Sequence, residues 1–162
     1  EVLGWYDKLR PYADERARVN PGERLGQFDV AGKNVLVLIC ADFWFSDLFL
    51  QAETLPDLVI VPALSVTRKP TPDYSRRLWR HLAISRAYEF GLFVGISDWA
   101  HDSALPSLMT SGVGGFADAT HADPDTFYTP ILPSGVMMLE PDFEALEQFR
   151  QDRGDRGFYW KK

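Results

Sequence analysis

Short apolar runs alternate with polar stretches along the chain, and their lengths are those of strands and helices. Nearly continuous β-branched and leucine runs predict strands covered on both faces at 34–39, 58–61 and 92–96. Apolar residues at helical spacing predict helices over 42–50 and 74–90. This alternation implies right-handed crossovers and a partly parallel sheet. The predicted fold class is therefore α/β or α+β, with helices on the faces of the sheet.

Weaker patterns predict the remaining elements. Short strands are expected at 1–7, 27–30, near 108–109, near 127–128 and at 135–139. A C-terminal helix is expected over 142–150, and the Pro- and Gly-punctuated segment 8–26 predicts a long loop of the kind that often carries function. No linker or internal repeat divides the chain, so we expect one domain over residues 1–162.

Composition narrows the classes of function. Hydrophobic residues make up 46% of the 162 residues and aromatic residues 14%, which argues against disorder. A formal net charge of −6 disfavours a nucleic-acid partner. No apolar run approaches the roughly 20 residues of a membrane span, and no signal peptide opens the chain. The single cysteine excludes an internal disulfide and a cysteine-based zinc site, and it predicts a reducing, cytoplasmic setting.

Cys40 lies at the abrupt junction between the predicted strand over 34–39 and the predicted helix that follows. Such a strand fixes the sulfur, while the start of a helix supplies positive potential that lowers the pKa of a thiol. The thiolate is the nucleophilic form, and the N–H group of Ala41 is placed to stabilise an oxyanion. On position alone, the alternative is that Cys40 is a small buried hydrophobic residue.

The segments around this cysteine resemble those of the nitrilase, or carbon–nitrogen hydrolase, superfamily. Residues 37–45 (VLICADFWF) have its nucleophile motif: an apolar strand, a cysteine, one variable residue, an acidic residue and an aromatic or apolar stretch. Residues 6–22 resemble its catalytic-lysine segment, in which a lysine is followed by a loop with proline and glutamate and then by Pro-Gly.

Two later segments extend the resemblance. Residues 56–63 are similar to the family's strand after the cysteine, and 82–97 are similar to its arginine- and glutamate-containing helix and the next strand. Each segment alone is weak. Together they follow the family's order and cover most of residues 5–140, which makes the combined signal specific.

The resemblance implies the roles of three residues. Cys40 matches the nucleophile, Lys8 the catalytic lysine, and Glu15 the second glutamate, which helps position the site. The family's general-base glutamate precedes the lysine. Only seven residues precede Lys8 here, and Glu1 is in the wrong context, so we assign no base.

The resemblance also implies a four-layer αββα sandwich, of which this chain supplies the later strands and helices. Because the chain opens on Glu1 rather than Met and at once reaches the lysine segment, we expect a domain that lacks its N-terminal segment. General acid–base help is typically worth about 10²–10⁴-fold. We therefore expect residues 1–162 alone to be essentially inactive as a hydrolase. A longer parent chain with an upstream glutamate is expected to hydrolyse substrate over many turnovers.

The implied function is a thiol hydrolase that cleaves the carbon–nitrogen bond of a small amide, nitrile or carbamoyl compound, without metal or cofactor. The alternative is a catalytically incomplete or non-catalytic family member that acts through protein association. Candidate substrate contacts are Phe43 and Trp44 after the nucleophile, and Ser97 and Trp99 at the end of the strand over 92–96. For two of the three aromatic residues at 43–45, core packing is an explanation at least as good.

Self-association is a further expectation. The family forms dimers by stacking sandwiches through helices that follow the nucleophile. The predicted helix over 74–90 carries Trp79, Tyr88 and Phe90 in addition to its apolar stripe. We therefore expect a homodimer or larger oligomer that uses this helix or the one after Cys40.

The histidines offer a weaker alternative chemistry. A Cys–His dyad or a metal site would have to draw on His81, His101 and His121. No spacing in the sequence specifies the orienting Asn or Asp of a dyad or the third ligand of a metal. His81 is predicted to lie on the surface.

Two further motifs have no role in the predicted chemistry. Arg76, Arg77 and Arg80 form the densest basic group, for which a solvated helix face is favoured over an anion site. Residues 111–115 (SGVGG) have the composition of a phosphate loop, but no Gly-Lys-Ser/Thr follows them. A flexible turn that lets the backbone pass close to the site is the favoured interpretation.

Overall fold

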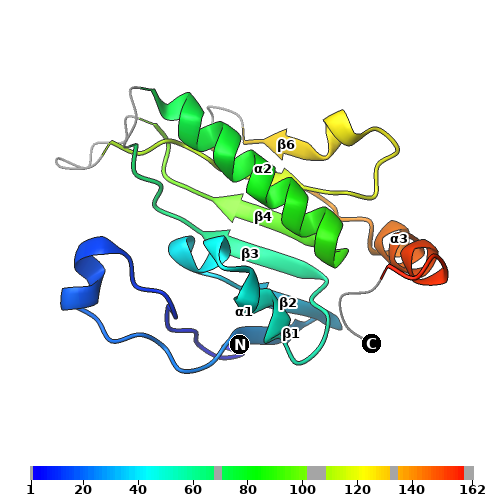
Figure 1. The fold of residues 1–162 in the computed structure, drawn as a ribbon, viewed down its shortest axis with the longest axis horizontal. Coiled ribbons are helices and arrows are strands. Elements are labelled where there is room, and N and C mark those ends of the chain that lie inside the picture. Colours follow the sequence, from blue (N-terminus) through cyan, green and yellow to red (C-terminus); the bar gives the residue numbers. More distant parts are fainter. Residues whose placement is uncertain (1, 68–70, 102–108, 132–134, 159–162) are drawn as a thin grey trace.

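The computed structural model describes residues 2–67, 71–101, 109–131 and 135–158, which form one mixed β-sheet flanked by helices (Figure 1). In chain order its strands are β1 (Gly26–Val30), β2 (Lys33–Val37), β3 (Leu58–Pro62), β4 (Phe93–Ser97), β5 (Gly115–Ala117) and β6 (Tyr128–Pro130). The strands lie side by side in that same order. β3 pairs in parallel with β2 and β4, and the other neighbours are antiparallel. The predicted mixed α/β fold is therefore confirmed.

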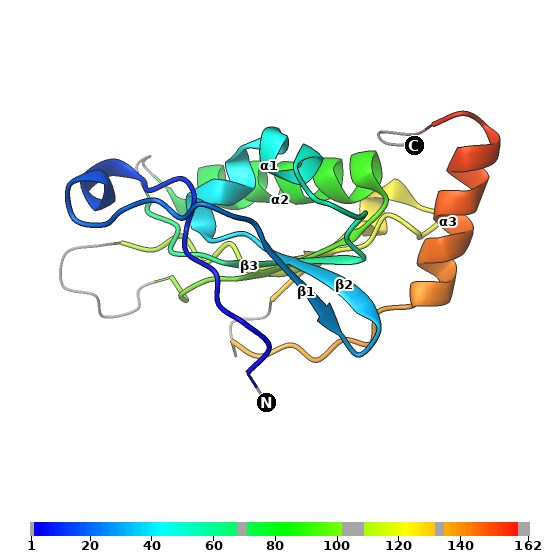
Figure 2. The same cartoon turned by 90° about the horizontal axis from the view of Figure 1, so that it is seen from below.

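The helical elements are η1 (Ala13–Ala17), η2 (Cys40–Trp44), α1 (Ser46–Leu50), α2 (Pro72–Phe90), η3 (Pro124–Thr126) and α3 (Phe143–Asp155), of which those labelled η are 3₁₀ turns. Figure 2 shows α1 and α2 on one face of the sheet and α3 standing at one end of it. None of the described helices is both long enough and apolar enough to cross a membrane.

Helix α2 covers the centre of the sheet. Pro72 in its first turn has the fixed φ that suits a helix start, and Gly91 ends it in the left-handed region at φ 60°. Its buried face includes Trp79 and Phe90, and the Trp79 ring is stacked on that of Phe43 at 5.9 Å. Both aromatic residues are therefore core residues, and the expected oligomer surface on α2 loses two of the three side chains on which it rested. Tyr88 remains half exposed.

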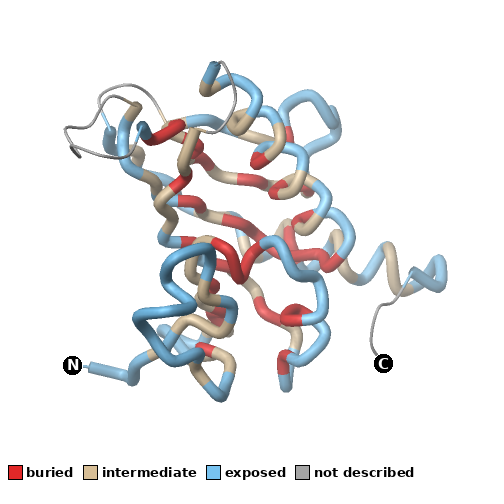
Figure 3. The backbone as a smooth tube through the Cα atoms, turned by 60° about the vertical axis from the view of Figure 1, so that its left-hand side comes forward, coloured by how far each residue is buried: buried red, intermediate tan, exposed pale blue. Residues whose placement is uncertain are grey.

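The two faces of the sheet differ in how they are covered. Residues that point toward α2, such as Val59, Val94 and Ile96, are buried, and Figure 3 shows this core through the middle of the molecule. On the opposite face Ile60 is 40% exposed, and among the described helices only α3 reaches that face, where Phe143 meets Phe93. The described residues thus form one sheet and one helical layer of the implied four-layer sandwich.

Several predicted elements are absent or displaced. Residues 2–7 and 135–139 are not strands, although both are apolar; Met138 is 93% exposed. The predicted helix over 42–50 is interrupted at Phe45, which separates η2 from α1. Near the strand predicted at 108–109, whose first residue lies outside the described part, Thr110 makes only an isolated bridge with Val66.

Candidate active site

Cys40 sits where the chain leaves the sheet after β2 and turns into η2. Its φ of 49° is in the left-handed region, which costs an L residue free energy and is characteristic of strained functional positions. This conformation makes the turn from the strand into η2 sharp, in the manner of a nucleophile elbow. The Sγ atom lies 3.6 Å from the carbonyl oxygen of Leu64, in the segment that follows β3. The carboxyl ends of the parallel strands therefore meet at this cysteine.

The Lys8 side chain is held by a carboxylate. Its Nζ atom lies 2.6 Å from Oε2 of Glu15, and the Lys8 side chain is only 12% exposed. The same Glu15 oxygen accepts the N–H of Tyr12 at 2.7 Å. Partial burial alone would raise the pKa of Glu15, but these two hydrogen bonds outweigh it, so the pKa is lowered. Glu15 therefore stays ionised and keeps the ammonium group in place.

Asp42 fixes the lysine segment against the cysteine turn. This fully buried carboxylate accepts the Arg10 N–H at 2.6 Å, the Tyr6 hydroxyl at 2.7 Å and, at 3.4 Å, the Leu9 N–H. It also reaches back to the Ile39 N–H at 3.1 Å. The Asp42 side chain thus joins Ile39, directly before Cys40, to residues on either side of Lys8.

The glycine in the Pro-Gly pair of the lysine motif is required for steric reasons. The N–H of Gly22 donates to the carbonyl oxygen of Lys8 at 2.8 Å. A Cβ atom on Gly22 would lie 2.2 Å from the carbonyl oxygen of Asp7, closer than any side chain tolerates. Only glycine therefore allows the loop to close behind Lys8.

The thiol of Cys40 is not activated in the way the sequence predicted. Burial raises its pKa, and the carboxylates of Glu15 and Asp98 add to this, while the Lys8 ammonium opposes it. The expected lowering by a following helix is wrong, because only the short 3₁₀ turn η2 follows directly and its field is small. These charges nevertheless place Lys8, Glu15 and Asp98 within electrostatic reach of the sulfur.

Asp98, at the end of β4, organises the loops around the site, and sequence reasoning missed it. Its carboxylate accepts the N–H of Ser65 at 3.0 Å, the hydroxyl of Ser65, and the N–H of Val113 at 2.8 Å. Ser65 follows Leu64, whose carbonyl oxygen contacts Cys40. Asp98 therefore positions the segment against which the thiol rests.

We expect Asp98→Asn to shift the pH profile of Cys40 alkylation to lower pH. The carboxylate is one cause of the raised pKa of the thiol, so its removal should lower that pKa and increase the thiolate fraction at neutral pH. Iodoacetamide labelling from pH 6 to 10, followed by mass spectrometry, measures the profile. Asp118→Asn is the control, since Asp118 binds Thr120 in a turn between β5 and β6. An unchanged midpoint would exclude an electrostatic effect of Asp98 on the thiol.

The other predicted site residues lie in different environments. Ala41 is buried directly after Cys40, and Phe43 is fully buried in the core, where it stacks on Trp79. Trp44 is partly exposed with its ring edge-on to Trp79. Ser97 and Trp99 are both exposed. Trp44, Ser97 and Trp99 thus remain candidate substrate contacts, whereas Phe43 supports the fold.

The histidines are engaged elsewhere. Nδ1 of His101 lies 2.7 Å from the carbonyl oxygen of Thr110, and His121 lies near Thr126 and Asp118 in an exposed turn. His81 is exposed on α2, as predicted. The described residues contain no group of three His, Cys, Asp or Glu side chains suited to holding a metal ion.

Comparison with known proteins identifies the fold. No protein-family model matches the sequence, and no curated protein sequence matches it. Among solved structures, Saccharomyces cerevisiae Nit3, a member of branch 10 of the nitrilase superfamily, is similar over 85% of this chain, with 25% identity and a TM-score of 0.67. An amidase from Nesterenkonia sp. is similar over 96% of the chain, with 20% identity and a TM-score of 0.62. XC1258 from Xanthomonas campestris, a CN-hydrolase superfamily protein, matches 72% of the chain with 21% identity and a TM-score of 0.58.

The fold of the chain is that of the nitrilase, or carbon–nitrogen hydrolase, superfamily, as the order of its motifs predicted. It spans about half the length of these structures: 48% of Nit3, 56% of the amidase and 45% of XC1258.

Proposed function

We propose that this domain acts as a thiol hydrolase of small amides, nitriles or carbamoyl compounds, with Cys40 as the nucleophile. The observation that carries the proposal is the left-handed Cys40 turn beside a Lys8 ammonium that Glu15 holds at 2.6 Å. A largely buried ammonium group whose charge acts on the thiol of a strained cysteine suits a reaction in which negative charge develops at that point.

The chemistry follows from these positions. For an amide, the Cys40 thiolate attacks the carbonyl carbon, and a carbon–sulfur bond forms while the carbonyl oxygen becomes an oxyanion. The Lys8 ammonium and the Ala41 N–H group stabilise that oxyanion. The carbon–nitrogen bond then breaks, the departing nitrogen takes up the proton that left the thiol, and water hydrolyses the remaining thioester.

Proton transfer requires a general base other than the two carboxylates that act on the thiol. Glu15 is bound to Lys8 and Tyr12, and Asp98 accepts three hydrogen bonds from Ser65 and Val113. Both are occupied as positioning groups. We propose that the base is a glutamate supplied from outside residues 1–162, as the family resemblance implies, and that without it the thioester forms faster than it is hydrolysed.

Acyl trapping tests the function. Incubation of the chain with p-nitrophenyl butyrate should release about one equivalent of nitrophenol in a burst and add one butyryl group at Cys40, detected by intact mass and peptide mapping. Cys40→Ala should show neither. A thiol that reacts with iodoacetamide only after denaturation would identify Cys40 as a structural cysteine, and the chain as a non-catalytic member of the superfamily.

A further inference from the structure

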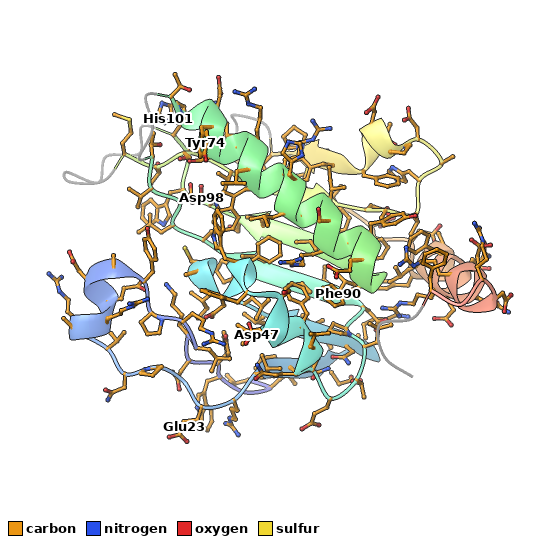
Figure 4. All side chains as sticks on the ribbon, viewed as in Figure 1. Glu23, Asp47, Tyr74, Phe90, Asp98 and His101 are labelled. Carbon is orange, nitrogen blue, oxygen red and sulfur yellow. The ribbon has the colours of Figure 1, made fainter. Side chains whose placement is uncertain are left out.

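Two sequence motifs without a role in the hydrolase chemistry meet in one hollow. Arg76, Arg77 and Arg80 of α2 line one side of it, and the glycine-rich residues 112–114 line another. The hollow has a volume of about 660 Å³, within the usual range of about 300–1,000 Å³ for small-molecule sites. Figure 4 shows Asp98 and His101, which also line it, near the end of the molecule where α2 begins.

The hollow depends on its glycines. Gly112 has a φ of 64°, and a Cβ atom there would lie 3.0 Å from the backbone nitrogen of His101. A Cβ atom on Gly114 would lie 2.8 Å from Cδ1 of Ile131 and 3.2 Å from the carbonyl oxygen of Ile96. The backbone at both glycines thus runs close against neighbouring residues, and a larger residue at either position would be strained or would clash.

Arg76 ties the glycine wall to the helix. Its Nε atom donates to the carbonyl oxygen of Ser111 at 2.8 Å. Arg80, on the same helix face, acts on Tyr128 in the wall of the hollow. Burial raises the pKa of the Tyr128 hydroxyl, and the charge of Arg80 partly opposes this rise. That hydroxyl donates to the carbonyl oxygen of Val113 at 2.9 Å. Arg76 and Arg80 therefore both act on the glycine-containing wall of the hollow, and the exposed Arg77 lines it beside them.

Charge in the hollow is strongly unbalanced. Among the described residues, three guanidinium groups line it with one carboxylate, Asp98, which is already bound to Ser65 and Val113. The described residues offer Arg77 no salt-bridge partner, and Arg76 has only the exposed Asp73, at 3.3 Å. Like charges three and four residues apart on a helix repel one another. An anion in the hollow would relieve this repulsion in a protein whose overall charge is −6.

We propose that the hollow between α2 and residues 112–114 binds the oxyanion group, a carboxylate or a phosphate, of a small molecule. Guanidinium groups match both anions through paired N–H donors. Arg77 and Arg80 are the principal ligands, and Arg76 orients the glycine segment. The proposal does not rest on the hydrolase function, since none of the three arginines is assigned to it.

Binding is tested by calorimetry at low salt with two probes, inorganic phosphate and glutarate, on the 162-residue chain. We expect at least one probe to bind, and the Arg77→Gln/Arg80→Gln double variant to bind it at least tenfold more weakly. Arg18→Gln is the matched control, because it removes another exposed arginine that does not line the hollow, and it should leave affinity within twofold. Preference for one probe assigns the ligand as a phosphate or a carboxylate.

Phenylglyoxal modification locates the site independently. The bound probe should protect Arg77 and Arg80 from modification and leave Arg18 reactive, as read by peptide mass spectrometry. Circular dichroism checks that the double variant is folded. Absence of binding by the unmodified chain at millimolar probe, or equal weakening by Arg18→Gln, would overturn the proposal.

Discussion

Replacing Lys8 with methionine is expected to slow acylation of Cys40 by about 10²–10³-fold, the usual effect of removing one oxyanion donor. Methionine keeps the length of the side chain and removes its charge. The Lys8 ammonium is largely buried, so water cannot readily replace it. The measurement is the rate of nitrophenol release in the burst phase with p-nitrophenyl butyrate.

A second reagent separates two effects of this substitution. Alkylation by iodoacetamide forms no oxyanion, so Lys8→Met should slow it only through the pKa of Cys40, which rises when the cation is lost. Acylation should therefore fall much further than alkylation. Lys33→Met, which removes a lysine packed over the Phe143 ring, should change neither rate. Equal slowing of both reactions would contradict an oxyanion role for Lys8.

Replacing Asp42 with alanine is expected to destabilise the domain by about 3 kcal/mol or more. The substitution leaves the buried or half-buried donors of Tyr6, Leu9, Arg10 and Ile39 without their acceptor, and each such loss costs about 1–3 kcal/mol. Urea unfolding monitored by tryptophan fluorescence gives the change in the free energy of unfolding.

The control for this prediction is a nearby aspartate. Asp47 forms an exposed ion pair with Arg10 at 2.6 Å, so Asp47→Ala should cost less than about 1 kcal/mol. Asp42→Asn keeps one carbonyl oxygen and should remain folded, while the Lys8 segment loses part of its attachment and acylation slows. An Asp42→Ala variant as stable as Asp47→Ala would mean that the lysine segment is held by other contacts.

The sequence predicted those parts of the fold whose apolar residues form long or strictly periodic patterns. The strands β2, β3 and β4 follow from continuous apolar runs, and α2 follows from its spacing and from Gly91. The apolar residues at 2–6 and 135–139 misled the prediction, because a strand requires a neighbouring strand as well as suitable residues. β5 was missed since its three residues, Gly115–Ala117, are too few to show alternation.

The residues of the candidate site likewise fall into those that the sequence indicated and those that only the structure revealed. Lys8, Glu15 and Cys40 were proposed from motif order, and the structure brings Glu15 to Lys8 and both charges within reach of the thiol. Asp42 and Asp98 were not assigned, because their partners are mostly backbone N–H groups, which carry no side-chain signature. The raised pKa of Cys40 depends on burial, which only the packed structure determines.

At Cys40, the left-handed backbone brings the stability of the fold into conflict with the reactivity of the thiol. At φ 49° glycine is relaxed, whereas any residue with a Cβ atom carries a penalty of roughly 1–2 kcal/mol. A library of variants selected only for heat resistance would therefore be drawn toward glycine at position 40, and its most robust members would have lost the sulfur. Substitutions that stabilise this domain for practical use thus have to be made at other positions, because the trade-off between stability and reactivity is concentrated at residue 40.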